Sequence, residues 1–410
     1  MSEKLLNGKS FEQLSYEVER KLVPIDPALF APYEQLADPI EQIYLSRPDE
    51  AYTLRVRAHH APDSTRYTAT LKDKGEMTTH GLARLEIETD IDQAAYEHYA
   101  SDPQYPRVSK RRATLVDGVT VDWIDGMEQP LIEIEKVADN PLAAQFHADF
   151  AANLIDVTGD PAYDNSTIAF DQFGGTFEPL PEVSADMIVE EILAQLQTGK
   201  SHAVVGISGM SGSGKTTLAT EVRQLLERRF GERLPAIAQF STDDYHRGRH
   251  RLEAEYGAPW TNWDLPEVYD TETLAQHIAA LKAGQSVPRH AFDFPRQETV
   301  VTGVIEPSPV VIVEGIFAGS PDLNAVRDLH FAVPTPIATT VARDLLRLVS
   351  SDRANSSIST PEQRLRYQLE TAIPTYQAQE RPRRNSWSSS VRTIGKVAWL
   401  SQSASATPRP

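Results

Sequence analysis

The stretch AVVGISGMSGSGKTTLATEV, residues 203–222, decides the fold of the C-terminal half of the chain. Its first six residues form a near-continuous apolar run, which is typical of a strand buried on both faces of a parallel sheet. The next eight, GMSGSGKT at 209–216, fit the pattern G-x-x-x-x-G-K-[ST] between a strand and a helix. Glycines allow backbone N–H groups to approach phosphate oxygens, and the helix N-terminus favours anions. The stretch therefore predicts an α/β domain with a phosphate-binding loop.

This loop defines the expected nucleotide site. We expect Lys215 to reach the β and γ phosphates of ATP and to act in catalysis, and the Thr216 hydroxyl to hold Mg²⁺. The simpler alternative is a glycine-rich strand–helix turn with a surface lysine. The expected nucleotide-binding residues are Gly209, Ser211, Gly212, Ser213, Gly214, Lys215, Thr216 and Thr217.

Carboxylates follow two further apolar runs in the same half. The stretch FSTDDYH at 240–246 and the stretch VVIVEGI at 310–316 each place acidic side chains at the carboxyl end of a strand. Ligands of open α/β sheets bind at that edge. We expect Asp243, or alternatively Asp244, to accept a proton from an attacking hydroxyl, and Glu314 to hold Mg²⁺.

Residues 203–318 resemble the uridine kinase and phosphoribulokinase group of P-loop kinases. The resemblance rests on GISGMSGSGKTT, STDDYH, NWDLPEVYD, VPRHAFDF and VIVEGIFA, which occur in that order. It implies that Asp243 is the catalytic base and that Asp264 contacts hydroxyls of the phosphoryl acceptor. It further implies that Phe292 and Phe294 line the acceptor pocket.

Several positions depart from that family's pattern. His246 and Phe292 each stand where a tyrosine is usual, and Arg296 and Gln297 follow FDF where a histidine is usual. The segment VARDLLRLVSSDRANSS replaces an arginine-rich lid. Phosphoryl transfer is therefore expected, whereas uridine as the acceptor is left open.

The N-terminal half alternates charged and apolar residues in six short segments. Side chains at positions i and i+2 share one face of a strand, so these charges project in pairs. Acidic pairs are Glu17 and Glu19, Glu86 and Glu88, and Glu133 and Glu135; basic residues are Lys21, Arg55, Arg57, Lys72, Lys74, Arg84, Lys110 and Arg112. A solvent-exposed face of an antiparallel sheet would show the same pattern of charges. If the sheet closes, the charges share a lumen that ions and phosphates would have to compensate.

EVERK at 17–21 is the Glu-x-Glu-x-Lys signature of CYTH domains, the triphosphate tunnel metalloenzymes, and this segment resembles them. LRVR, LK, RLEIE, KRR and IEIE follow in matching order within residues 11–168. The resemblance implies a tunnel of about eight antiparallel strands that binds a linear triphosphate. The six glutamates would hold Mg²⁺ or Mn²⁺, the basic residues would bind the triphosphate, and Lys21 would act in catalysis. Tripolyphosphate, thiamine triphosphate, nucleoside triphosphates and cyclisation of ATP remain open.

Length, net charge and composition limit the domain organisation that the chain can have. It has 410 residues, a formal net charge of −18 and no cysteine. We expect a barrel domain over residues 1–175, a linker over 176–183 within FDQFGGTFEPLPEV, a kinase domain over 184–400 and a disordered tail over 401–410. The charge argues against nucleic-acid binding, and no apolar run of membrane-spanning length is present. Without a visible secretory signal, we expect a cytoplasmic protein.

The sequence thus predicts a two-domain phosphate-handling enzyme. One domain would hydrolyse a triphosphate, and the other would transfer a phosphoryl group from ATP to a small hydroxyl compound. In a rival hypothesis, one domain senses a nucleotide or polyphosphate and regulates the other. The oligomeric state cannot be read from the sequence.

Overall fold

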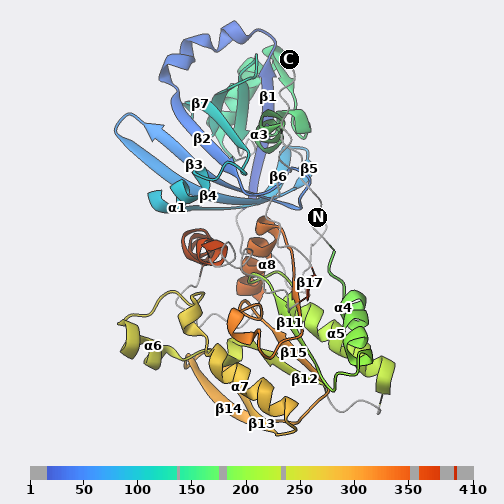
Figure 1. Ribbon diagram of the computed structural model, residues 1–410. Helices are drawn as coiled ribbons and strands as arrows, with labels where there is room; N and C mark the ends of the chain where they lie inside the picture. Colours follow the sequence, from blue (N-terminus) through green and yellow to red (C-terminus); the bar gives the residue numbers. More distant parts are fainter. Residues whose placement is uncertain are drawn as a thin grey trace.

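A computed structural model describes residues 16–135, 139–174, 182–231, 237–350, 360–378 and 392–394. A barrel forms one part and a layered α/β unit the other, with helices α8 (Ile337–Ser350) and α9 (Pro361–Tyr367) between them (Figure 1). The tail expected over 401–410 and most of the linker expected over 176–183 lie outside the described residues.

Eight antiparallel strands close into a ring in the N-terminal part. In order around the ring they are β1 (Tyr16–Pro24), β9 (Leu131–Glu135), β8 (Val119–Ile124), β7 (Arg107–Val116), β2 (Asp38–Tyr44), β3 (Tyr52–Ala61), β4 (Ser64–Asp73) and β6 (Gly81–Asp90). β6 returns to pair with β1 and closes the ring. Short strands β5 (Glu76–Thr78) and β10 (Leu154–Asp156) extend β6 and β1. The predicted closed antiparallel barrel is therefore confirmed.

The barrel also contains elements that the sequence pattern did not reveal. β2 was missed, because its sequence DPIEQIY lacks clear alternation and contains a proline. α3 (Asn165–Phe173) extends into the glycine- and proline-rich stretch that looked like a linker. The other helices of this part are α1 (Gln93–Ala100) and α2 (Pro141–Phe150).

Strand register brings the charged faces together inside the barrel. Glu17 lies opposite Arg84, and Lys72 lies opposite Glu86. Glu19 and Lys21 of β1 lie opposite Glu135 and Glu133 of β9. Since residues between them, such as Leu71 and Ile87, face outward and are buried, the barrel has a polar lumen and an apolar exterior on this side.

The C-terminal part is built on a parallel sheet, as predicted. Its order is β12 (Ala238–Ser241), β15 (Val310–Glu314), β11 (Ala203–Ser208), β16 (Leu329–Ala332) and β17 (Arg392–Ile394). A hairpin of β13 (Val287–Asp293) and β14 (Glu298–Ile305) stands apart from it. The helices are α4 (Ala185–Gln197), α5 (Lys215–Phe230), α6 (Arg249–Tyr256), α7 (Thr271–Lys282), α8 and α9. Among the described residues, no helix is long and apolar enough to cross a membrane.

One hydrophobic core runs through both parts of the chain. Val56 on the outer face of β3 belongs to the same buried cluster as Val341 of α8 and Leu365 of α9. Polar contacts add to it, because Tyr99 OH donates to the Leu369 carbonyl at 2.9 Å and Arg366 Nε donates to the Asp90 carbonyl at 2.6 Å. The barrel wall and the α/β unit are therefore packed as continuous protein interior.

α8 also contacts the phosphate-binding loop. Gly212 has φ +84°, and a Cβ atom there would lie 2.4 Å from the Thr340 carbonyl oxygen, so the loop requires glycine at this point. Just before α8, Thr335 Oγ1 donates to the Ser213 carbonyl at 3.0 Å. The same helix thus borders the barrel on one side and the loop on the other.

Candidate functional site

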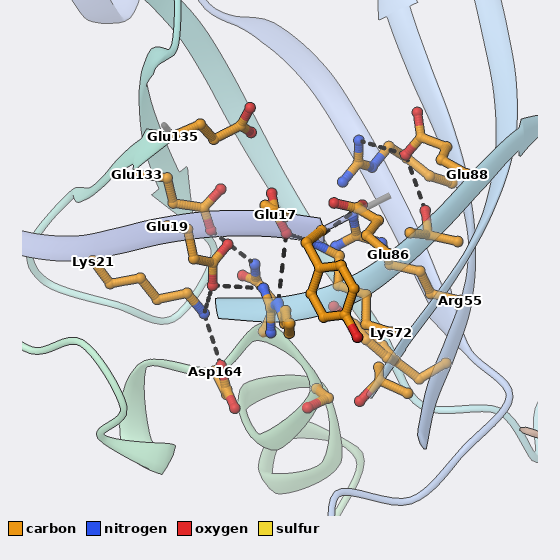
Figure 2. A pocket seen from close by; sticks show the side chains of 18 of the residues that line it. Glu17, Glu19, Lys21, Arg55, Lys72, Glu86, Glu88, Glu133, Glu135 and Asp164 are labelled. Carbon is orange, nitrogen blue, oxygen red and sulfur yellow. Dashed lines mark hydrogen bonds and ion pairs between the residues drawn. The ribbon is translucent and has the colours of Figure 1, made fainter. Parts of the chain in front are cut away.

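The barrel lumen is a cavity of about 420 Å³ with charged walls. Figure 2 shows acidic side chains of β1, β6 and β9 and basic side chains of β1, β3 and β4 directed into the same space. Of the residues expected to bind metal or triphosphate, the lumen is lined by Glu17, Glu19, Lys21, Arg55, Arg57, Lys72, Arg84, Glu86, Glu88, Arg112, Glu133 and Glu135.

Two of the expected triphosphate-binding lysines are not among the lining residues. Lys74 follows the end of β4, and its Nζ donates to the Pro48 carbonyl at 2.5 Å. Lys110 is fully buried on β7, where its Nζ lies 2.6 Å from Asp122 Oδ2. Burial and the neighbouring Arg112 lower the pKa of Lys110 to about 7. Lys110 thus lies within the barrel wall beside Asp122, which also contacts Arg112.

Opposite charges in the lumen compensate one another across neighbouring strands. Lys72 Nζ lies 2.5 Å from Glu17 Oε2 and 3.1 Å from Glu86 Oε1. Arg84 NH2 lies 2.5 Å from Glu19 Oε1. Such pairs hold buried charges in a fixed arrangement, and an incoming anion or cation must compete with them.

Asp164 is a lumen residue that the sequence reading missed. It directly precedes the first residue of α3, and its Oδ1 lies 2.7 Å from Lys21 Nζ. Burial alone lowers the pKa of Lys21, but Glu19 and Asp164 raise it above its ordinary value, so this amine stays charged. No local pattern could have revealed the contact, because Asp164 is 143 residues away from Lys21 in the chain.

The donor chemistry of the lumen suits a hard divalent cation and phosphate. Burial raises the pKa of Glu135, and the neighbouring Glu17 and Glu133 raise it further. Opposite it, the buried Nε of Arg55 has no hydrogen-bond partner in the described part of the chain. Carboxylate oxygens are the ligands that Mg²⁺ and Mn²⁺ prefer, and guanidinium groups bind phosphate.

No ready-made set of three metal ligands exists among the described residues. Glu17 and Glu19 are both buried lumen glutamates, and both are held by lysine or arginine. A bound cation would therefore replace Lys72 or Arg84 as the partner of these carboxylates, which frees the basic groups for phosphate.

The second cavity, of about 590 Å³, lies at the carboxyl edge of the parallel sheet. Lys215 Nζ donates to the Met210 carbonyl at 3.2 Å, and Thr216 Oγ1 donates to Glu314 Oε2 at 2.9 Å. Of the expected nucleotide-binding residues, Ser211, Gly212, Gly214, Lys215, Thr216 and Thr217 line this cavity. Gly209 and Ser213 lie behind them, with the Ser213 Oγ 2.5 Å from where a Gly209 Cβ would be.

Three carboxylates gather around the end of this loop. Asp243, Asp244 and Glu314 all line the cavity. Burial and then the charges of Asp243 and Glu314 raise the pKa of Asp244 to about 6. Burial raises the pKa of Glu314 as well, although Lys215 opposes the shift. The donor set of Thr216 and Glu314 thus fits Mg²⁺, because a cation would relieve this excess negative charge.

Aromatic side chains and a half-buried carboxylate line another part of the cavity. The predicted acceptor residues Asp264, Phe292 and Phe294 all line it, together with Trp263. Asp264 Oδ2 accepts a hydrogen bond from Tyr367 OH at 2.5 Å, and burial raises the pKa of Asp264. The structure therefore brings together a phosphate loop, a carboxylate cluster and a hydrophobic pocket.

Helix α9 and the residue after it supply wall residues that the sequence reading missed. Arg364, Tyr367 and Gln368 line the cavity. Arg364 Nε and Gln368 Nε2 donate to Asp344 Oδ2 at 2.6 and 2.5 Å, which ties α9 to α8. The sequence does contain a capping box, in which Thr360 and Gln363 satisfy each other's backbone groups. That motif predicts a helix start but not the site that the helix faces.

Known proteins of two kinds are similar to parts of this chain. Residues 204–351 match the model of the Phosphoribulokinase / Uridine kinase family. A uridine kinase of Clostridium perfringens is 32% identical over 150 residues, which are 36% of this chain and 69% of that protein. An inorganic pyrophosphatase, TTM2 of Arabidopsis thaliana, is 29% identical over 188 residues, which are 45% of this chain and 25% of that protein.

A solved structure is also similar to part of the chain. The crystal structure of the inorganic triphosphatase NE1496 shares 26% identity and covers 37% of this chain and 93% of its own, with a TM-score of 0.24.

Proposed function

The chain belongs, through residues 204–351, to the phosphoribulokinase and uridine kinase family, and on that premise we propose that it transfers the terminal phosphoryl group of ATP to a small, nucleoside-like hydroxyl compound. The observation that carries this proposal is the cavity shared by Lys215, Asp243 and the aromatic pocket. The loop N–H groups and Lys215 hold the phosphates, and Asp243 accepts the proton of the attacking hydroxyl.

We further propose that the barrel hydrolyses a linear triphosphate, either tripolyphosphate or an organic triphosphate. Support comes from the lumen, where basic and acidic side chains alternate within about 420 Å³. Arg55, Arg57, Arg84 and Arg112 bind phosphate oxygens, while Lys21, held by Asp164, stabilises charge on the phosphoryl group under attack.

Both proposed reactions use Mg²⁺ or Mn²⁺. In the barrel, Glu17, Glu19, Glu86, Glu88, Glu133 and Glu135 are the candidate ligands, and in the kinase cavity Thr216 and Glu314 are. The cation, when bound, supplies charge neutralisation on the phosphate oxygens. ATP and small phosphorylated compounds are thus the proposed partners.

A second candidate function is regulation of one part by the other. It is favoured by the core that joins β3 to α8 and α9, and by α8 bordering the phosphate-binding loop. In this version the lumen binds a nucleotide or polyphosphate without turnover and alters the kinase. Thiamine triphosphate hydrolysis is one case of the first proposal. Cyclisation of ATP would be a different reaction, in which a ribose hydroxyl attacks the α-phosphate and pyrophosphate leaves.

A phosphate-release screen on the purified full chain tests these proposals. It uses tripolyphosphate, pyrophosphate, thiamine triphosphate and ATP with Mg²⁺ or Mn²⁺, each with and without uridine. Release from tripolyphosphate without any acceptor supports a barrel hydrolase. If no compound releases phosphate while tripolyphosphate still alters phosphoryl transfer, the barrel is a regulatory site.

A further inference from the structure

The helix that begins with α9 contains a π turn where it meets the barrel. α9 is followed without a break by the π-helical residues Gln368–Ala372, and helical structure continues to residue 378. The N–H of Ile373 donates to the Gln368 carbonyl, five residues earlier, rather than to the carbonyl four residues earlier. π turns are rare and are frequent at functional sites. The hydrogen bonds around this turn show what holds it in place.

The π turn deprives the Leu369 carbonyl of its usual donors from the helix. In an α-helix this oxygen would accept from the N–H of Ile373, which donates to Gln368 instead. In a π-helix it would accept from the next residue, but Pro374 has no N–H. Because Leu369 is fully buried, bulk water does not supply the missing donor.

The barrel supplies that donor. Tyr99 of α1 is fully buried, and its OH donates to the Leu369 carbonyl at 2.9 Å. α1 lies beside this helix (Figure 1), and two further barrel residues hold its last described turn. His98 Nε2 lies 2.9 Å from Gln377 Oε1, and Tyr105 OH accepts from Gln377 Nε2 at 3.0 Å. The position of the π turn is therefore fixed from outside the α/β unit.

The two residues directly before Leu369 reach the kinase cavity. Tyr367 OH donates to Asp264 Oδ2 at 2.5 Å, and Gln368 Nε2 donates to Asp344 Oδ2 at 2.5 Å. Both side chains line the cavity. Neighbouring residues of one helical turn share its rotation, so the position of the Leu369 carbonyl also sets where these two side chains point. The barrel hydroxyl and the cavity carboxylates are thus joined through a single turn of helix.

The residue after the proline provides a second link to the same carboxylate. Thr375 Oγ1 accepts a hydrogen bond from Asn262 Nδ2 at 3.2 Å. Asn262 Oδ1 in turn accepts from the backbone N–H of Asp264 at 3.0 Å. Both the side chain and the backbone of Asp264 are therefore held from the segment that the barrel fixes.

We propose that Tyr99 of the barrel is a positioning residue for the kinase cavity, where it holds Tyr367 against Asp264 by completing the π turn. This inference rests on the proposed kinase function, in which Asp264 binds hydroxyls of the acceptor. It goes beyond that function by giving the barrel a part in acceptor binding that requires no ligand in the lumen. The acceptor site of the kinase would therefore be incomplete without the barrel.

Hydrogen exchange of the full chain, followed by mass spectrometry, tests the positioning without turnover. Tyr99→Phe removes only a hydroxyl, and Tyr96→Phe is the matched control, because Tyr96 lies on the same helix and its OH donates to Glu41 within the barrel. We expect the amides of residues 261–265 to exchange about tenfold faster in Tyr99→Phe than in the native chain, and less than about twofold faster in Tyr96→Phe. The phosphate-binding loop at 209–217 should exchange as in the native chain.

A second-site change tests the route through the π turn. Pro374→Ala supplies an N–H at the position from which a π turn bonds the Leu369 carbonyl. Combined with Tyr99→Phe, it should restore about half or more of the lost protection of residues 261–265. The proposal is overturned if these residues exchange alike in Tyr99→Phe and Tyr96→Phe, or if Pro374→Ala restores nothing.

Phosphoryl transfer measured in parallel tests the kinase function separately. Where a nucleoside is phosphorylated, Tyr99→Phe should raise the KM for that acceptor about 3- to 10-fold and leave the KM for ATP unchanged. An unchanged acceptor KM would overturn the proposal. If the native chain phosphorylates no acceptor, the kinase function is refuted, while the exchange measurement still decides whether Tyr99 positions Asp264.

Discussion

The barrel lumen and the kinase cavity treat buried charge in opposite ways. In the lumen, carboxylates lie next to cations at close range, as with Lys72 and Glu17 at 2.5 Å. In the kinase cavity, three carboxylates surround one loop, and burial with mutual repulsion raises the pKa of Asp244 to about 6. The charges of the lumen are therefore already balanced, and a ligand must displace existing ion pairs in order to bind. In the kinase cavity, by contrast, the carboxylates repel one another until a cation binds.

This difference predicts opposite responses to the loss of one acid. Removing a carboxylate from a compensated buried network leaves a cation without a partner and destabilises the fold. Removing one from a cluster of like charges relieves repulsion and stabilises the fold, even where function is lost.

The largest effect is expected at Asp122, which supports the lumen from behind. Its side chain is fully buried and lies 2.6 Å from both Lys110 Nζ and Arg112 NH2. Asp122→Ala should lower the free energy of unfolding by about 3–5 kcal/mol, measured by urea denaturation. Glu190→Gln removes the acid of an exposed pair with Arg229 and should cost under about 1 kcal/mol. Equal effects of the two changes would contradict the interpretation that the buried charges around the lumen stabilise one another.

The next effect concerns the core that joins the two parts. Leu365 on α9 is fully buried in the cluster that includes Val56 of the barrel. Leu365→Ala should cost about 2–5 kcal/mol, and barrel and α/β unit should still unfold in one transition. Scanning calorimetry with tripolyphosphate or an ATP analogue identifies the part that unfolds, because a ligand raises the unfolding temperature of the part that binds it. Two separate transitions in the native chain would mean that the shared core does not couple them.

Asp244→Asn should have a smaller effect of opposite sign. Because the folded-state pKa of Asp244 lies above its ordinary value, the ionised form destabilises the fold above about pH 6. Without metal, the variant should be more stable than the native chain by about 1–2 kcal/mol near pH 7.5, after allowance for partial solvent exposure. Denaturation repeated below about pH 4, where both forms are neutral, should show no difference. If the variant is less stable than the native chain near pH 7.5, the negative charge of Asp244 does not destabilise the fold.

The smallest effect is expected at Glu362, which reaches the lumen from α9 rather than from the barrel. It adds an exposed negative charge beside an anionic substrate. Glu362→Gln should lower KM for tripolyphosphate no more than about threefold, and the change should disappear at high ionic strength. Steady-state kinetics at two salt concentrations checks this. A large effect on kcat would instead place Glu362 in the catalytic machinery.

Local patterns were sufficient for the residues that project from regular elements. The alternation in EVERK places Glu17, Glu19 and Lys21 on one face, and the lumen indeed contains all three. The loop glycines and Lys215 follow from a motif whose geometry is local. By contrast, Lys74 was assigned to the lumen by the same alternation, but it lies one residue past the end of β4 and its Nζ donates to the Pro48 carbonyl.

Contacts between distant segments could not be predicted in this way. Asp164 reaches Lys21, and Tyr367 reaches Asp264, because tertiary packing brings separate elements together. His246 was visible in the sequence as a departure from a family pattern. Only the structure shows that Trp263, Phe292 and Tyr269 surround its ring and that neither ring nitrogen has a hydrogen-bond partner among the described residues.

The most direct test of two separate phosphate chemistries is a crossed measurement on two variants. Lys215→Ala and the double variant Glu17→Gln with Glu19→Gln are each assayed for ATP-dependent transfer and for tripolyphosphate hydrolysis with Mg²⁺. We predict that Lys215→Ala loses transfer at least about hundredfold and keeps hydrolysis, and that the double variant shows the reverse. Loss of tripolyphosphate hydrolysis in Lys215→Ala, or full hydrolysis in the double variant, would contradict the assignment of the two reactions to separate sites.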